Sequence, residues 1–254
     1  MSTTRNVLHL LEDFSNDFKI QFGFYLDILD KVYYMQSKIG LSEVNLSSLE
    51  EEDQNIFKSY LFLVESSNTT SIGALRLLSS NLYSDAYSLL RILYEIACLL
   101  HYGNISIENK REIYYSIFKS GLSESDHKKK EWKLIQKAQR ELESKNGEYA
   151  NIRRELNNFG GHISRTKIVL GNVTTLRNAT ASNLFTSNFV NRHFLAGLDF
   201  LFSMEMLILD EYCNHLEYYD GVPKLIKKDI KDLPGVFLEG VRPKLQSIID
   251  PSSV

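Results

Sequence analysis

Proline is missing from most of this chain, and its absence is the most informative feature of the composition. All four prolines lie in the last 32 residues, so residues 1–222 contain none. Proline disrupts the interior of a helix, because it lacks an amide hydrogen and its ring clashes with the preceding turn. The sequence therefore favours a single helical domain over residues 1–222. Residues 223–254 form a proline-containing extension that we expect to pack on it.

Cysteine and long apolar runs are scarce as well, and each shortage excludes a class of protein. Two cysteines, Cys98 and Cys213, are too few for a disulfide framework or a zinc knuckle. No segment reaches the ~18 unbroken apolar residues of a membrane span, since the most apolar one, residues 89–100, contains Arg91 and Glu95. The amino-terminal residues also lack the apolar core of a signal peptide. We therefore expect a cytoplasmic protein with no membrane partner.

The short motifs of several common enzyme classes are also lacking. There is no Walker loop, no Gly-x-Gly-x-x-Gly, no His-Glu-x-x-His and no nucleophile elbow. A carboxylate-bridged metal pair needs Glu-x-x-His on two helices, and only Glu124 and His127 have that spacing. No metal and no other cofactor is therefore expected. His215, four residues after Glu211, is expected to form a pair on the surface of a helix.

The apolar residues follow a helical period over most of the chain. Glycines such as Gly103 interrupt that period at points where helices commonly end. Residues 71–74 contain Gly73 inside a helical pattern, which predicts a close crossing of two helices. Helices are expected at roughly 5–39, 47–80, 84–102, 107–120, 124–158 with a break near 147, and 187–219.

Residues 160–186 differ from the rest, because they are rich in Gly, Asn, Ser and Thr. They predict a long polar loop or a short β-hairpin between two helices. Together with the helical segments, this predicts an all-α multi-helix bundle interrupted once by an irregular segment.

The segment 84–102 is apolar nearly all round when drawn on a helical wheel, so it is expected at the centre of the bundle. A polar stripe along it includes Tyr87, Arg91, Glu95 and Tyr102. Arg91 and Glu95 are four residues apart, and we expect them to be largely buried and paired with each other or with nearby tyrosines. The pair either clamps the bundle together or faces a functional cleft.

Charge is distributed unevenly along the chain. Residues 1–104 carry a net charge of -6 and residues 105–155 a net charge of +3, while residues 156–198 contain no acidic side chain. A stretch without carboxylates suits a surface that contacts phosphate, because nothing there repels the anion. The alternative is an uncharged polar loop with no binding role.

Seven polar side chains that suit phosphate chemistry gather around the end of the helix predicted to finish near residue 158. Arginine can clamp a phosphate with two hydrogen bonds, and histidine transfers protons near neutral pH. The alternative for the histidine is a surface or capping residue. The set consists of Arg153, Arg154, Asn157, Asn158, His162, Arg165 and Lys167.

Two stretches match patterns of a known family. Residues 82–95, LYSDAYSLLRILYE, contain Leu-Tyr-x-x-Ala followed by Leu-Leu-Arg-x-Leu-x-Glu, and residues 156–164 contain Leu, five residues, His-x-Ser. Over about residues 65–165 this order of patterns resembles bacterial HEPN-like proteins of the abortive-infection and toxin type. The resemblance implies a helical bundle, a homodimer, and an antiviral-defence or toxin effector that cleaves RNA.

The resemblance also implies roles for the polar cluster. His162 and Arg154 would be catalytic in a metal-independent endoribonuclease, and the remaining members, Arg153, Arg165, Lys167, Asn157 and Asn158, would bind RNA phosphates. Catalytic members of the family place four to six residues between the Arg and the His, whereas seven residues separate Arg154 from His162. The alternative is therefore a non-catalytic helical module that senses or binds a partner protein.

Overall fold

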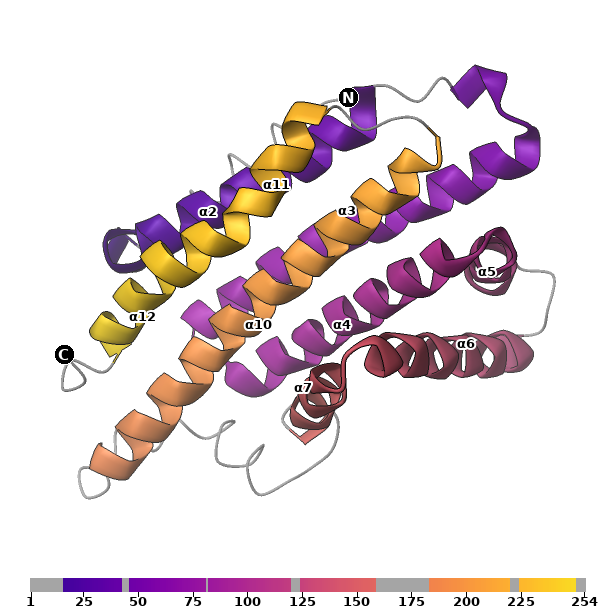
Figure 1. Ribbon diagram of the computed structural model, residues 1–254. Helices are drawn as coiled ribbons and strands as arrows, with labels where there is room; N and C mark the ends of the chain where they lie inside the picture. The colour runs from indigo at the N-terminus through magenta and orange to yellow at the C-terminus, as the bar shows by residue number, and fades with distance from the viewer. Residues whose placement is uncertain are drawn as a thin grey trace.

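The computed structural model describes residues 16–42, 46–80, 82–119, 124–158, 183–219 and 224–249. All regular structure within these ranges is helical, which confirms the predicted all-α packed bundle (Figure 1). The α-helices are α2 (Asn16–Ser42), α3 (Glu51–Ser79), α4 (Tyr83–Ile105), α5 (Ile107–Ile113), α6 (Glu124–Lys145), α7 (Glu148–Leu156), α10 (Asn183–Glu217), α11 (Lys224–Val236) and α12 (Arg242–Ile249). Shorter helical turns are η1 (Leu46–Ser48), of the 3-10 type, and two π-helical turns, η2 (Tyr114–Phe118) and η4 (Phe237–Val241).

The predicted helices agree with the observed ones to within a few residues at most ends. The segment expected at 84–102 is α4, and the break expected near 147 separates α6 from α7. The loop or hairpin expected at 160–186 lies mostly outside the described residues, as does the predicted helix before residue 16.

Helix α4 lies at the centre of the described bundle, as its apolar circumference predicts. It packs against α3, α10, α6, α5 and α7, and Figure 1 shows α3, α4 and α10 running side by side along the molecule. Leu93 is fully buried and Ile96 nearly so. Burying this much apolar surface is the main favourable term in folding, at about 25 cal/mol per Å² removed from water.

Two glycines allow α3 and α4 to approach each other closely. A Cβ atom at Gly73 of α3 would lie 3.0 Å from Leu89 Cδ1 of α4, which confirms the predicted close crossing. Gly103 was expected to end a helix, and that prediction is wrong, because α4 continues to Ile105. The glycine is instead needed for packing: a Cβ atom there would overlap the hydroxyl oxygen of Tyr60 on α3.

The C-terminal helices pack along one side of this body. Helix α11 and the turn η4 follow one another, and α12 continues the chain onto α10. The Phe237 ring of η4 stacks on Phe202 of α10 with centroids 3.9 Å apart, and it also meets Tyr25 of α2 edge to face. These aromatic contacts hold the extension against α2 and α10.

Among the described helices, none is long and apolar enough to cross a membrane.

The packing at Gly103 gives a first prediction. The variant Gly103→Ala should lower the free energy of unfolding by about 3 kcal/mol or more, because the added methyl group forces Tyr60 out of its place. Gly23→Ala is the matched control, since a Cβ atom at Gly23 of α2 meets no atom within 4 Å. That control should be neutral or stabilising by up to ~1 kcal/mol, since alanine is the better helix former. Urea denaturation measures both, and equal stabilities of the two variants would contradict this account.

Candidate functional site

A basic groove of about 570 Å³ lies beside α6, where that helix packs against η2 and where Glu112 of α5 contributes to the lining. Four cationic side chains line it, and they recur along one face of α6 at intervals of three and four residues. Glu112 is the single carboxylate among the described residues that line it. The cations are Lys130, Lys133, Lys137 and Arg140, and Ser116, Leu134 and Gln136 complete the lining. The net positive charge of residues 105–155 is visible in the sequence, and the spacing of these four cations on one helix face is the further signal that could have revealed the groove.

The carboxylate of Glu112 is already occupied. Lys137 Nζ donates to it at 2.9 Å, and the hydroxyl of Tyr102 donates to it at 2.5 Å. Burial alone would raise the pKa of Glu112, but these two donors outweigh that effect and hold its pKa below the usual range. Tyr102, a member of the predicted polar stripe, therefore supplies one of the two hydrogen bonds to Glu112 from α4. Lys130, Lys133 and Arg140 remain exposed to solvent.

The wall of the groove opposite α6 is formed in part by a π-helical turn. Ser116 lies in η2, where the wider turn follows directly on α5. Single π turns inside helical segments are rare and are frequently found at functional sites. The residues of this turn, YYSIF, add no negative charge beside α6.

The predicted pair of Arg91 and Glu95 forms, with Arg91 Nε 3.1 Å from Glu95 Oε1. The side chains are 27% and 20% exposed, so the prediction that they are largely buried is only partly correct. Burial raises the pKa of Glu95, and the guanidinium opposes that shift. Tyr87 donates to the backbone oxygen of His193, which ties α4 to α10. The pair thus lies at the edge of the core.

Arg153 is held by an ion pair within the bundle. Its guanidinium contacts both carboxylate oxygens of Glu143, Nε to Oε1 at 2.5 Å and the terminal nitrogen to Oε2 at 3.1 Å. Tyr94 of α4 donates to the same carboxylate at 3.2 Å. These contacts join α7, α6 and α4, so a phosphate could reach Arg153 only in competition with Glu143.

Three more of the predicted phosphate ligands are placed at the end of α7. Arg154 and Asn158 are exposed, and Asn157 is half-buried. The other three predicted residues, His162, Arg165 and Lys167, lie outside the described residues. The predicted catalytic pair of Arg154 and His162 therefore stays a prediction.

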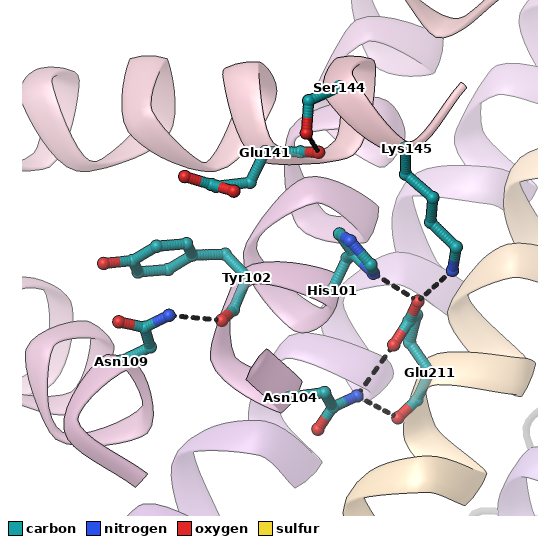
Figure 2. A network of polar contacts seen from close by, with 8 residues as sticks. All are labelled: His101, Tyr102, Asn104, Asn109, Glu141, Ser144, Lys145 and Glu211. Atoms are coloured by element: carbon teal, nitrogen blue, oxygen red, sulfur yellow. Dashed lines mark hydrogen bonds and ion pairs between the residues drawn. The ribbon is translucent and has the colours of Figure 1, made fainter. Parts of the chain in front are cut away.

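A second polar network, which the sequence analysis missed, is centred on Glu211 of α10 (Figure 2). His101 Nδ1 lies 2.7 Å from Glu211 Oε1, and Asn104 Nδ2 donates both to Glu211 Oε2 and to its backbone oxygen. Lys145, the last residue of α6, adds a longer ion pair at 3.8 Å. Burial would raise the pKa of Glu211, but these partners hold it below the usual range. The network ties α4, α6 and α10 together.

His215 lies one turn beyond Glu211, and the expectation that the two form a surface pair is wrong. The imidazole is fully buried and stacks on Tyr60 with ring centroids 3.8 Å apart. Lys110 Nζ of α5 lies 3.2 Å from His215 Nδ1 and 4.4 Å from the ring centre of Tyr218. Burial lowers the pKa of Lys110 to about 8, and burial with the nearby amine lowers the pKa of His215 well below its usual value. The neutral imidazole therefore accepts from the ammonium.

A third buried group is Glu205 of α10, which no solvent reaches. Gln36 Nε2 of α2 donates to its Oε2 at 2.8 Å, and Ser71 of α3 also hydrogen-bonds to the carboxyl group. Burial raises the pKa of Glu205 to about 7, although both hydrogen bonds oppose the shift. Such a carboxyl group is largely protonated in mildly acidic solution.

Among the described residues, no three potential metal ligands of the His, Cys, Asp or Glu type lie close enough together to hold an ion. Cys98 and Cys213 are buried free thiols.

Comparison of the chain with models of protein families, with curated proteins and with solved structures gave no match. The HEPN-like resemblance therefore has no support from these comparisons.

The state of Glu205 gives a second prediction. Its pKa is raised from 4.5 in the unfolded chain to about 7 in the folded one, so the folded state binds more protons between these values and stability falls as pH rises through them. Glu205→Gln keeps the acceptor for Gln36 and removes the ionisation. This variant should gain on the order of 3 kcal/mol over wild type at pH 8 and little at pH 4. Urea denaturation between pH 4 and 8 measures the free energy of unfolding of both proteins. The prediction is refuted if that free energy changes with pH by the same amount in wild type and in the variant.

Proposed function

We propose that this protein binds RNA through the basic groove on α6. The observation that carries the proposal is the row of Lys130, Lys133 and Arg140, which are exposed, while Glu112, the one carboxylate among the described lining residues, is bonded by Lys137 and Tyr102. Cationic side chains around a cleft attract phosphates and release their counterions, which supplies most of the affinity of sequence-independent binding.

The length of the row suits a polynucleotide better than a single phosphate. Ten residues of α-helix separate residues 130 and 140, which corresponds to about 15 Å along the axis. A row of this length can contact several successive phosphates of a polynucleotide, since neighbouring phosphates of one strand lie only a few ångström apart.

The catalytic part of the proposal rests on the end of α7. Helix α7 directly follows α6, and Arg153 is bound to Glu143 there, whereas Arg154 is accessible to solvent. Arg154 is therefore the better of the two arginines for stabilising charge on a phosphate, with His162 as the proton-transfer group of a metal-independent cleavage. A HEPN-like defence or toxin effector that dimerises in the cytoplasm is the biological setting we propose.

An acidic segment of a partner protein would bind to the same cationic side chains of the groove. This is the alternative function, and the binding experiment separates the two, because it measures RNA directly.

The third prediction tests RNA binding. A fluorescein-labelled single-stranded RNA of about 20 nucleotides is titrated at several salt concentrations, with anisotropy as the readout. The triple variant Lys130→Ala, Lys133→Ala, Arg140→Ala should bind about tenfold more weakly or worse, and the slope of log K against log salt should fall by about 2. Lys31→Ala, Lys58→Ala, Lys231→Ala is the control, since it removes the same charge from exposed positions on α2, α3 and α11.

Equal losses in the two triple variants would mean that net charge alone matters, and the groove would be excluded. If wild type does not bind RNA at low salt, the partner-protein alternative replaces the proposal. Cleavage is read from the same RNA on a gel in the presence of a chelator. Cleavage products that form with wild type and disappear with His162→Ala and Arg154→Ala support the catalytic roles. If the RNA stays intact with wild type, the catalytic roles are wrong and only the proposed RNA binding is kept.

A further inference from the structure

Trp132 is the only tryptophan of the chain, and it lies on α6, the helix that carries the basic groove. Its side chain is 48% exposed, whereas tryptophan is highly buried in most proteins. Among the described residues, no aromatic ring stacks on the indole and no cation lies over it. The exposed part of the indole is therefore free to contact a ligand.

Trp132 lies at the edge of the groove, one helical turn from a residue that lines it. Trp132, Gln136 and Arg140 follow one another at intervals of four residues, so their side chains form one row along α6. Gln136 and Arg140 line the groove, and all three side chains are exposed. Lys133 and Lys137 form the neighbouring row of the same helix. A polynucleotide bound to these cations would therefore pass beside the indole.

The charges around Trp132 also favour a polyanion. Lys129 lies three residues before it and Lys133 directly follows it, and both lysines are exposed. The acidic neighbour, Glu131, is turned about 100° away around the helix axis. There it lies 3.6 Å from His127 Nε2. Phosphates on either side of a base placed on the indole would thus be near a lysine.

A second exposed ring close to the groove, Tyr115 of η2, is already engaged. Its hydroxyl donates to Glu52 of α3 at 2.8 Å, and Lys119 Nζ lies 4.8 Å from the centre of its ring. A base that approached this ring would displace the lysine and bring its phosphates toward a carboxylate. Trp132 is therefore the better stacking surface for a ligand of the groove.

We propose that the groove binds RNA in single-stranded form, with one base stacked on Trp132 and the adjoining phosphates on Lys133 and Arg140. This inference rests on the RNA binding proposed above and names the form of the RNA. Stacking on an aromatic side chain is tolerant of sequence, because every base has a π-face. In a duplex the bases are paired and stacked on one another, so their faces are not available to the indole.

The fluorescence of the protein reports on this contact directly, because Trp132 is its only tryptophan. Single-stranded RNA of about 20 nucleotides, unlabelled and titrated into the full-length protein at low salt, should quench the tryptophan emission by about half or more. The midpoint should equal that of the anisotropy titration. A duplex of the same length should leave the emission nearly unchanged at saturation. N-acetyltryptophanamide is the control for light absorbed by the RNA.

Substitutions at Trp132 measure how much the contact contributes to affinity. Trp132→Ala should bind single-stranded RNA about tenfold more weakly and bind the duplex as wild type does. Its salt dependence should stay that of wild type, because no charge is removed. Trp132→Phe keeps an aromatic ring and should bind within about threefold of wild type. Tyr34→Ala is the control: this ring is 50% exposed on α2, which Figure 1 shows far from α6, and its removal should change nothing.

The outcomes separate this inference from the proposal on which it rests. If wild type binds single-stranded RNA but its emission stays unchanged and Trp132→Ala binds as tightly, RNA binding is kept and stacking is overturned. Equal losses of single-stranded and duplex binding in Trp132→Ala would overturn the preference for single strands. Wild type that binds neither RNA would remove both proposals. An emission that shifts to shorter wavelength as the protein is concentrated without RNA would mean that a second copy covers the indole, and would also overturn the site.

Discussion

The arrangement of this bundle depends on the burial of α4, because several polar groups on that helix find their partners on neighbouring helices. An unpaired buried donor costs more than a hydrogen bond gains, so the surrounding helices must supply acceptors at fixed places. Three carboxylates do so: Glu143 of α6 accepts from Tyr94, Glu112 of α5 accepts from Tyr102, and Glu211 of α10 receives His101 and Asn104. Each contact sets the position of a different helix around α4.

The basic groove is a consequence of this arrangement. Glu112 is oriented toward α4 by Tyr102 and is bonded by Lys137, so the carboxylate that would oppose a phosphate is satisfied within the protein. The neighbouring cations on the same face of α6 are left exposed. Arg153 illustrates the opposite case, because Glu143 is shared with Tyr94 and also neutralises that arginine. A carboxylate that accepts from a tyrosine of α4 thus leaves the cations of the groove exposed in one case, and in the other it also pairs with Arg153.

The sequence predicted what depends on local periodicity and missed what depends on distant partners. The start of α4, the break between α6 and α7 and the crossing at Gly73 follow from apolar spacing and glycine, and the structure confirms all three. His215 was misassigned because its neighbours Lys110 and Tyr60 are far from it in the chain, and a spacing of four residues from Glu211 looks the same on a surface or in a core. For the same reason, only the three-dimensional structure shows that Gly103 is required by Tyr60.

Native-state hydrogen exchange tests the central position of α4 most directly. If the burial of this helix governs the fold, its amides between residues 93 and 100 exchange only through global unfolding, and their exchange free energy equals that from denaturant unfolding. The account also predicts that α11 and α12, which contact only one side of the body, open at lower free energy. Amides of α4 that exchange by local opening while those of α12 stay protected would contradict it.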